Sequence, residues 1–131
     1  MIAADTNNIL RIVLNDNAKQ TAQVLKLVKG DGLLLLDAVL LEAAWVLESF
    51  YQATREQVFQ AMQGILGTQG IEPEGPAIYQ ALDWYRDGMD FEDAVILAAA
   101  VRNGCSDLST FDKHFIAKAR GKTDCRVRLP G

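Results

Sequence analysis

Four acidic side chains, Asp5, Glu42, Asp93 and Asp112, each lie at or just past the carboxyl end of a segment predicted to be a β-strand. In an open parallel sheet, ligands bind at that edge. Four carboxylates brought together there would repel one another strongly unless cations neutralised them. Ligands that are all oxygen select hard cations such as Mg²⁺ or Mn²⁺. The pattern therefore predicts a metal site suited to phosphodiester hydrolysis, where the metal generates hydroxide and stabilises the attacking and leaving oxygens.

Two of these acids also have a structural explanation. Asp5 ends an apolar segment and opens a helix, and Asp is a preferred N-cap residue. Asp112 could cap the next helix in the same way. Thr110 could form a hydrogen bond near Asp112 or bind a water on a metal. Thr6 and Asn7 belong to the polar cluster of Asp5 and are accessory candidates.

Glu42 is the more informative acid, because helical spacing surrounds it with apolar residues. Those neighbours are Ala38, Val39, Trp45 and Val46. A carboxylate on a core-facing stripe is costly unless a positive group meets it. The sequence leaves two explanations open, a structural partner such as an arginine and a metal-binding or catalytic role.

Asp90 and Asp93 form a D-x-x-D pair at the start of a helix whose next eight residues, 94–101, are all apolar. Such a run predicts a buried helix. Asp90 precedes the run and is the expected N-cap, so Asp93 is the expected ligand pointing toward the strand ends. Because both are acids, the division of roles between them stays open.

Strands and helices are predicted to alternate along the whole chain. The predicted strands are residues 1–5, 33–36, 71–72, 105–110 and 125–129. The predicted helices are residues 9–14, 16–28, 38–51, 54–66, 77–86 and 113–120, and one more that begins at residue 90 and is ended by Gly104. This alternation indicates an α/β protein, a single three-layer α/β/α domain over residues 1–131 with a mostly parallel central sheet.

Composition fits one ordinary globular domain of 131 residues, half of them hydrophobic. No apolar run is long enough to span a bilayer, and no signal peptide is evident. Cys105 and Cys125 lack metal-site or redox spacing and are expected to be reduced, which favours a cytoplasmic location.

Charge is distributed unevenly. Residues 1–101 hold 14 acids and 6 bases, a net charge of −8, whereas residues 102–131 hold 3 acids and 7 bases, a net charge of +4. An acidic body is a poor general binder of nucleic acid, but RNA could still bind along one basic edge or through metal ions. The candidate phosphate contacts are Lys113, Lys118, Arg120, Lys122, Arg126 and Arg128.

Four segments in order, MIAADTNNIL, LLEAAWVL, DFEDAVILAAA and LSTFD, resemble the PIN domain, and within it the VapC-type toxins of toxin–antitoxin pairs. The resemblance covers nearly the whole chain and implies that Asp5, Glu42, Asp93 and Asp112 bind the metal. It implies an Mg²⁺- or Mn²⁺-dependent endoribonuclease acting on structured RNA such as tRNA or rRNA. It also implies a homodimer and a cognate antitoxin protein. Asn8 departs from the family, which usually has an apolar residue there.

Two other functions compete with the ribonuclease. A non-catalytic PIN-fold module that binds proteins would use the acids only as helix caps, and an apolar setting for Glu42 argues against it. A phosphatase for small esters is disfavoured because no second Asp closely follows Asp5.

Apolar residues beyond the needs of one small core predict a homodimer through the first half of the chain; they are Val24, Leu27, Val58, Phe59 and Met62. Trp45 and Phe91 are expected in the core, and packing is the favoured role of Trp84 and Tyr85. His114 is expected at the surface, without a role in the chemistry.

Overall fold

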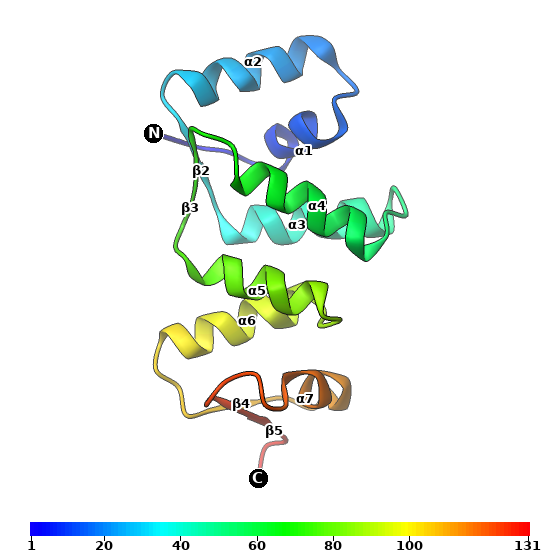
Figure 1. Ribbon diagram of the computed structural model, residues 1–131, viewed down its shortest axis with the longest axis vertical. Coiled ribbons are helices and arrows are strands. Elements are labelled where there is room, and N and C mark those ends of the chain that lie inside the picture. The colour runs from blue at the N-terminus through cyan, green and yellow to red at the C-terminus, as the bar shows by residue number, and fades with distance from the viewer. The chain divides into compact units, whose positions relative to one another are not determined.

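The computed structural model describes all residues, Met1–Gly131, and contains five strands and seven helices (Figure 1). The strands are β1 (Ile2–Ala3), β2 (Leu33–Leu35), β3 (Ile71–Pro73), β4 (Asp107–Ser109) and β5 (Arg126–Arg128). The helices are α1 (Thr6–Leu14), α2 (Ala18–Lys29), α3 (Asp37–Ser49), α4 (Arg55–Leu66), α5 (Ala77–Arg86), α6 (Phe91–Arg102) and α7 (Lys113–Ala119). Every predicted element is present. The chain divides into two compact units, unit 1 over Met1–Gly75 and unit 2 over Pro76–Gly131.

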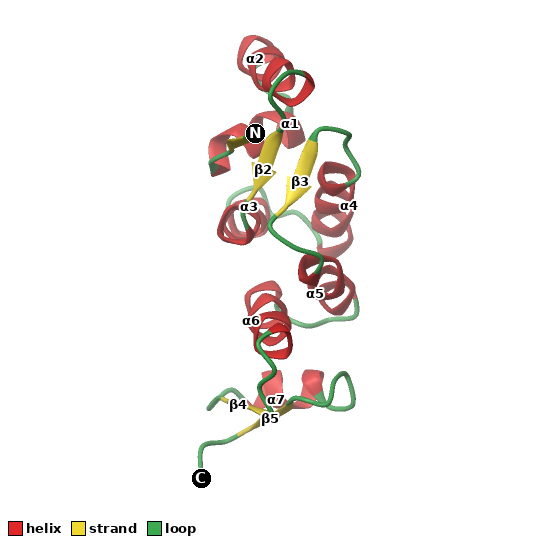
Figure 2. Cartoon of the chain, turned by 90° about the vertical axis from the view of Figure 1, so that its left-hand side faces the viewer, coloured by secondary structure: helices red, strands yellow, loops and turns green.

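Unit 1 is built on a parallel sheet of three strands in the order β1-β2-β3. The central strand β2 buries Leu33 and Leu35 almost completely, as four consecutive leucines between turn signals predict. Figure 2 shows β2 and β3 side by side, with helices around them. Helix α1 packs against α2, α3 and α4, and α4 also packs against β3, so helices cover the strands.

Helix α2 is capped by Asn17 and buries Thr21, Val24 and Val28. The spacing of a helix begun at Asp16 predicts a buried face of Ala22, Leu25 and Val28, but of these three only Val28 is buried. Asp16 instead forms an ion pair with Arg11, at 3.4 Å between Oδ1 and the guanidinium nitrogen. Val24, Val58, Phe59 and Met62, which motivated the homodimer, are also buried in the core of unit 1.

The start of α3 is capped from a distance. Asp is a preferred N-cap residue, but Asp37 is the first helical residue, and Leu36 at the N-cap position makes no side-chain hydrogen bond. The backbone N–H of Asp37 donates instead to Oε1 of Glu74, at 2.7 Å. This contact joins the loop after β3 to the helix that carries Glu42.

Unit 2 consists of the antiparallel helix pair α5 and α6, and α7 beside a two-stranded parallel sheet, β4-β5. Phe91, Trp84 and Tyr85 are buried, which confirms their expected packing role, and the rings of Tyr85 and Phe91 lie 5.3 Å apart. Helix α6 is only half buried, because Ile96 and Val101 are exposed although the run is apolar on all sides.

Parallel strands flanked by helices confirm the predicted α/β class, consistent with a PIN-like α/β/α fold. The strands form two parallel sheets, a three-stranded sheet in unit 1 and a two-stranded sheet in unit 2. The helices are all too short or too polar to cross a membrane.

Gly70 is the tightest backbone position in unit 1. Its φ is +94°, a side-chain Cβ there would lie 2.4 Å from the carbonyl oxygen of Val28, and its own carbonyl accepts from the N–H of Leu33 at 2.8 Å. We therefore expect Gly70→Ala to lower the free energy of unfolding by about 2 kcal/mol or more, measured by urea denaturation.

The matched control is Gly64→Ala, inside α4, where a new Cβ meets nothing within 4 Å. That change should raise the free energy of unfolding by about 0.5–1 kcal/mol, because Ala is the better helix former. Equal effects of the two substitutions would contradict this account of the contact between Gly70 and Val28.

Candidate metal-binding site

Asp5 has a structural role that leaves part of its carboxylate available. It is the N-cap of α1, and its Oδ1 accepts from both the backbone N–H and the side-chain amide of Asn8, at 3.3 and 3.1 Å. No hydrogen bond engages Oδ2. The sequence singled out Asn7 as an accessory residue, but Asn7 is exposed, and Asn8, the departure from the family pattern, orients Asp5.

Glu42 is exposed, so its predicted place on a core-facing stripe was wrong. Helix α3 buries Val39, Leu40, Ala43, Ala44 and Leu47, which puts Glu42 on the opposite side. Trp45, also expected in the core, lies on that side and is 66% exposed. The negative charge of Glu42 therefore does not need a buried cation to compensate it.

Thr6 connects the two acids of unit 1. Its hydroxyl donates to Oε2 of Glu42 at 3.0 Å, and Thr6 directly follows Asp5 in the chain. The start of α1 and the first half of α3 are thereby held together, as the packing of α1 on α3 requires. Thr6 therefore positions the Glu42 carboxylate, and Oε1 of Glu42 accepts no hydrogen bond.

Asp93 is the most perturbed acid of unit 2. Its pKa is raised to about 6, first by burial and then by the negative charges of Asp90, Asp112 and Glu92, against a lowering by His114. Asp90 caps α6, accepting from the N–H of Asp93 at 3.2 Å, as predicted. His114, expected to be uninvolved, is exposed but lies close enough to affect Asp93 electrostatically.

Asp112 repeats the arrangement of Asp5. As the N-cap of α7, it uses Oδ1 to accept from the N–H groups of His114 and Phe115, at 2.9 and 3.2 Å. Its own N–H donates to the hydroxyl of Thr110 at 3.0 Å, and the N–H of Thr110 donates to the carbonyl of Arg128 at 2.9 Å. Thr110 thus fixes the turn that carries Asp112, and Oδ2 of Asp112 accepts no hydrogen bond.

The donors suit a hard divalent cation. Unit 1 offers Asp5 and Glu42, unit 2 offers Asp93 and Asp112, and all their free atoms are carboxylate oxygens. The structure shows no group of three or more acidic, histidine or cysteine side chains around one metal position. Mg²⁺ is commonly held by only one or two carboxylates and keeps several waters. A carboxylate whose ionisation is opposed by neighbouring acids, as at Asp93, is stabilised by a cation.

The basic cluster near the C-terminus is partly neutralised. Arg126 and Arg128 both donate to Oδ1 of Asp107, at 2.9 and 3.2 Å, and Lys122 lies 3.8 Å from Asp87. A hydrogen bond from Ser106 and those from the two arginines hold the pKa of Asp107 below its usual value. Of the six candidate phosphate contacts, Lys113, Lys118 and Arg120 make no such ion pair.

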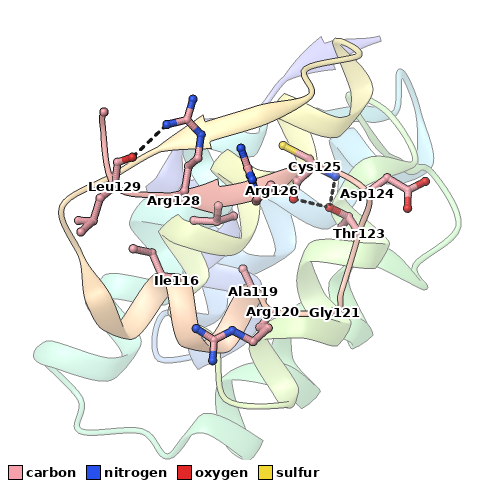
Figure 3. Close-up of a pocket in the computed structure, with 12 residues that line it drawn as sticks. Ile116, Ala119, Arg120, Gly121, Thr123, Asp124, Cys125, Arg126, Arg128 and Leu129 are labelled. Atoms are coloured by element: carbon pink, nitrogen blue, oxygen red, sulfur yellow. Dashed lines mark hydrogen bonds between the residues drawn. The ribbon is translucent and has the colours of Figure 1, made fainter.

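A cavity of about 680 Å³ lies between α7 and β5 (Figure 3). Arg120 lines it from the end of α7, and Arg126 and Arg128 line it from β5. Ile116 and Val127 add apolar surface. Both cysteines are unpaired, as expected; Cys125 lines the cavity, and burial raises the pKa of its thiol.

Asp93→Asn should stabilise the free protein above pH 6. Because the folded-state pKa of Asp93 is raised to about 6, ionising it opposes folding, a penalty absent below about pH 4, where folded and unfolded states are both protonated. We expect the variant to be more stable than the wild type by about 1 kcal/mol at pH 8, a gain reduced by solvent screening, and equally stable at pH 4.

Urea denaturation at the two pH values measures this difference. The control is Asp31→Asn in an exposed turn, which should show no such pH-dependent gain. If Asp93→Asn raised the free energy of unfolding equally at both pH values, the electrostatic account would be contradicted.

One comparison with known proteins gives the family. The family model described as "PIN domain" matches residues 2–121, which covers unit 1 and most of unit 2. A comparison with curated proteins found no match. The match includes all four candidate acids, with Asp5 near its start and Asp112 near its end. The chain therefore belongs to the PIN domain family.

Proposed function

We propose that this PIN domain is a VapC-type toxin, a metal-dependent endoribonuclease that hydrolyses phosphodiester bonds of structured RNA. PIN domains are generally nucleases, and those nucleases typically use divalent metals. The proposal assigns Mg²⁺ or Mn²⁺ to Asp5, Glu42, Asp93 and Asp112.

The observation that carries the proposal is the repulsion around Asp93. Partial burial and, after it, the negative charges of three other acids in unit 2 raise the pKa of this carboxyl, a configuration that opposes folding unless a cation offsets it. If these acids served only as helix caps, Asp93 would not be needed, because Asp90 already caps α6. Perturbed acids of this kind are common at functional sites.

The family match supports combining the two pairs of acids. One PIN model spans residues 2–121, so Asp5 and Glu42 of unit 1 and Asp93 and Asp112 of unit 2 fall within one family pattern. We propose on this basis that all four acids contribute to metal binding.

The chain's own residues would orient the ligands. Asn8 and Thr6 hold Asp5 and Glu42, and the turn at Thr110 holds Asp112, so each of these acids has one oxygen fixed and one available. A divalent metal bound there supplies an activated water and stabilises negative charge on the phosphate. Lys113, Lys118 and Arg120, which are free of ion pairs with acids, would contact phosphates and position the RNA.

The remaining parts of the proposal follow from the resemblance to VapC-type toxins. They are tRNA or rRNA as the substrate, a cognate antitoxin as the inhibitor, a homodimer and a cytoplasmic location. The homodimer rests on the resemblance alone, because four of the five apolar residues that first motivated it lie in the core.

A non-catalytic PIN-fold module is the alternative. The capping roles of Asp5, Asp90 and Asp112 favour it, since each acid has a structural reason to be present. The exposed position of Glu42 removes the argument that an apolar setting had given against it. Asp93 distinguishes the two functions, because it caps nothing.

Glu42→Gln, Asp93→Asn and Asp112→Asn should each lower cleavage of total RNA in Mn²⁺ by about a hundredfold or more. Loss of a metal ligand removes several kcal/mol of charge stabilisation in the transition state. The melting temperature should not fall, because Asn caps about as well as Asp, and Gln can still accept from Thr6. Asp31→Asn is the control and should retain full activity. Wild-type cleavage by Asp93→Asn would refute the catalytic assignment.

Mg²⁺ or Mn²⁺ should raise the melting temperature of the wild type, and the increase should diminish as the pH falls below about 6. Asp93 must lose its proton to bind the metal, and its raised pKa sets that range. Thermal scans at pH 8 and pH 5, each with and without metal, test this. The metal concentration is about 5 mM, well above a weak dissociation constant. Asp93→Asn should show little increase at either pH. Stabilisation by Zn²⁺ alone would contradict an all-oxygen site.

A further inference from the structure

Trp45 is exposed in a way that the fold of unit 1 does not require. Its side chain is 66% exposed, although α3 buries five apolar residues on its other side. A tryptophan placed in a core removes a large apolar area from water, a stabilisation that this exposed position largely forgoes. The core of unit 1 therefore does not explain a tryptophan here.

Trp45 lies one turn after Glu42 on the same side of α3. Residues three apart on a helix are neighbours, with Cβ atoms about 5–6 Å apart. Helical side chains point back toward the N-terminus, so an indole at position 45 is expected to extend toward the turn that carries Glu42. Of the other exposed residues of α3, Ala38 and Ser49 are small, and Glu48 lies three residues after Trp45.

We propose that Trp45 stacks on an unpaired base of the RNA, on the same side of α3 as the candidate metal ligand Glu42. The inference rests on the proposed ribonuclease function, and it assigns a single-stranded segment to the substrate at the cleavage point. Unpaired RNA bases are commonly recognised by stacking on exposed aromatic rings. Stacking accepts any base, so Trp45 would favour unpaired over duplex RNA without selecting a sequence.

Phe50 provides a matched comparison. It is 77% exposed, more than Trp45, but it follows the end of α3 and its ring packs edge-on against Tyr51, at 5.3 Å between centroids. It does not lie on the stripe of Glu42. If exposure alone produced RNA affinity, Phe50 would contribute as much as Trp45.

Fluorescence titration in EDTA tests the proposal without any cleavage. The probes are an unstructured oligoadenylate of about eight nucleotides, a chain of the same length without bases, and a duplex of the same length. We expect the oligoadenylate to quench the emission of the exposed Trp45, and the baseless chain and the duplex to bind more weakly. The second tryptophan, Trp84, is buried and should respond little.

Because the Trp45 variants lack the reporting indole, their affinities are measured by the anisotropy of a dye-labelled oligoadenylate. Trp45→Leu should weaken oligoadenylate binding about tenfold, Trp45→Phe should retain most of the affinity, and Phe50→Leu should bind like the wild type. None of these changes should alter the melting temperature or the mass measured by light scattering. Unchanged affinity of Trp45→Leu would overturn the inference. A lower melting temperature or a changed mass for Trp45→Leu would also overturn it, by showing that Trp45 packs within the fold or between two copies.

The two proposals can fail separately. Oligoadenylate binding that depends on Trp45, in a protein that cleaves no RNA with Mn²⁺, supports stacking and removes only the catalytic function. Metal-dependent cleavage that is equally efficient with Trp45→Leu, with unchanged KM, removes only the stacking role.

Discussion

Electrostatic repulsion among carboxylates is the constraint on which the candidate site depends. Asp93 is half-buried beside Asp90, Asp112 and Glu92, and its carboxyl retains a proton up to about pH 6. Evolution of a stable fold alone would favour fewer charges at this point, because each raises the free energy of the folded state. A bound divalent cation would attract these carboxylates and offset their repulsion. The same acids that destabilise the metal-free protein would then stabilise the metal-bound protein.

Helix caps give this arrangement its geometry. Asp5 and Asp112 each begin a helix and use one oxygen to accept backbone N–H groups, which fixes the direction of the other oxygen. One carboxylate can therefore cap a helix with one oxygen and bind a metal with the other. A capping role for Asp5 or Asp112 does not argue against a metal-binding role. Side chains held by hydrogen bonds of this kind are preorganised and lose little freedom when a ligand binds.

The two sides of helix α3 have different roles, one in packing the core and the other in the proposed binding of metal and RNA. One side supplies Leu40, Ala43 and Leu47 to the core of unit 1, and the other carries Glu42 and Trp45 toward solvent. Its N-terminus is held by the distant Glu74 and its exposed acid by Thr6, both from other segments of unit 1. Substitutions on the exposed side should thus alter ligand binding with little effect on folding.

Local patterns in the sequence determined the order of helices and strands, the parallel pairing and the cap at Asp90, because periodicity and capping are properties of short segments. They also made Asp5, Asp93 and Asp112 candidate metal ligands. Only the tertiary structure decided which side of a helix is buried. Glu42 and Trp45 have apolar neighbours in sequence, but α3 turns Ala43, Ala44 and Leu47 inward and leaves these two outside. The partners of the acids, Asn8 and Thr6, likewise depend on how α1 and α3 pack, which short-range spacing does not encode.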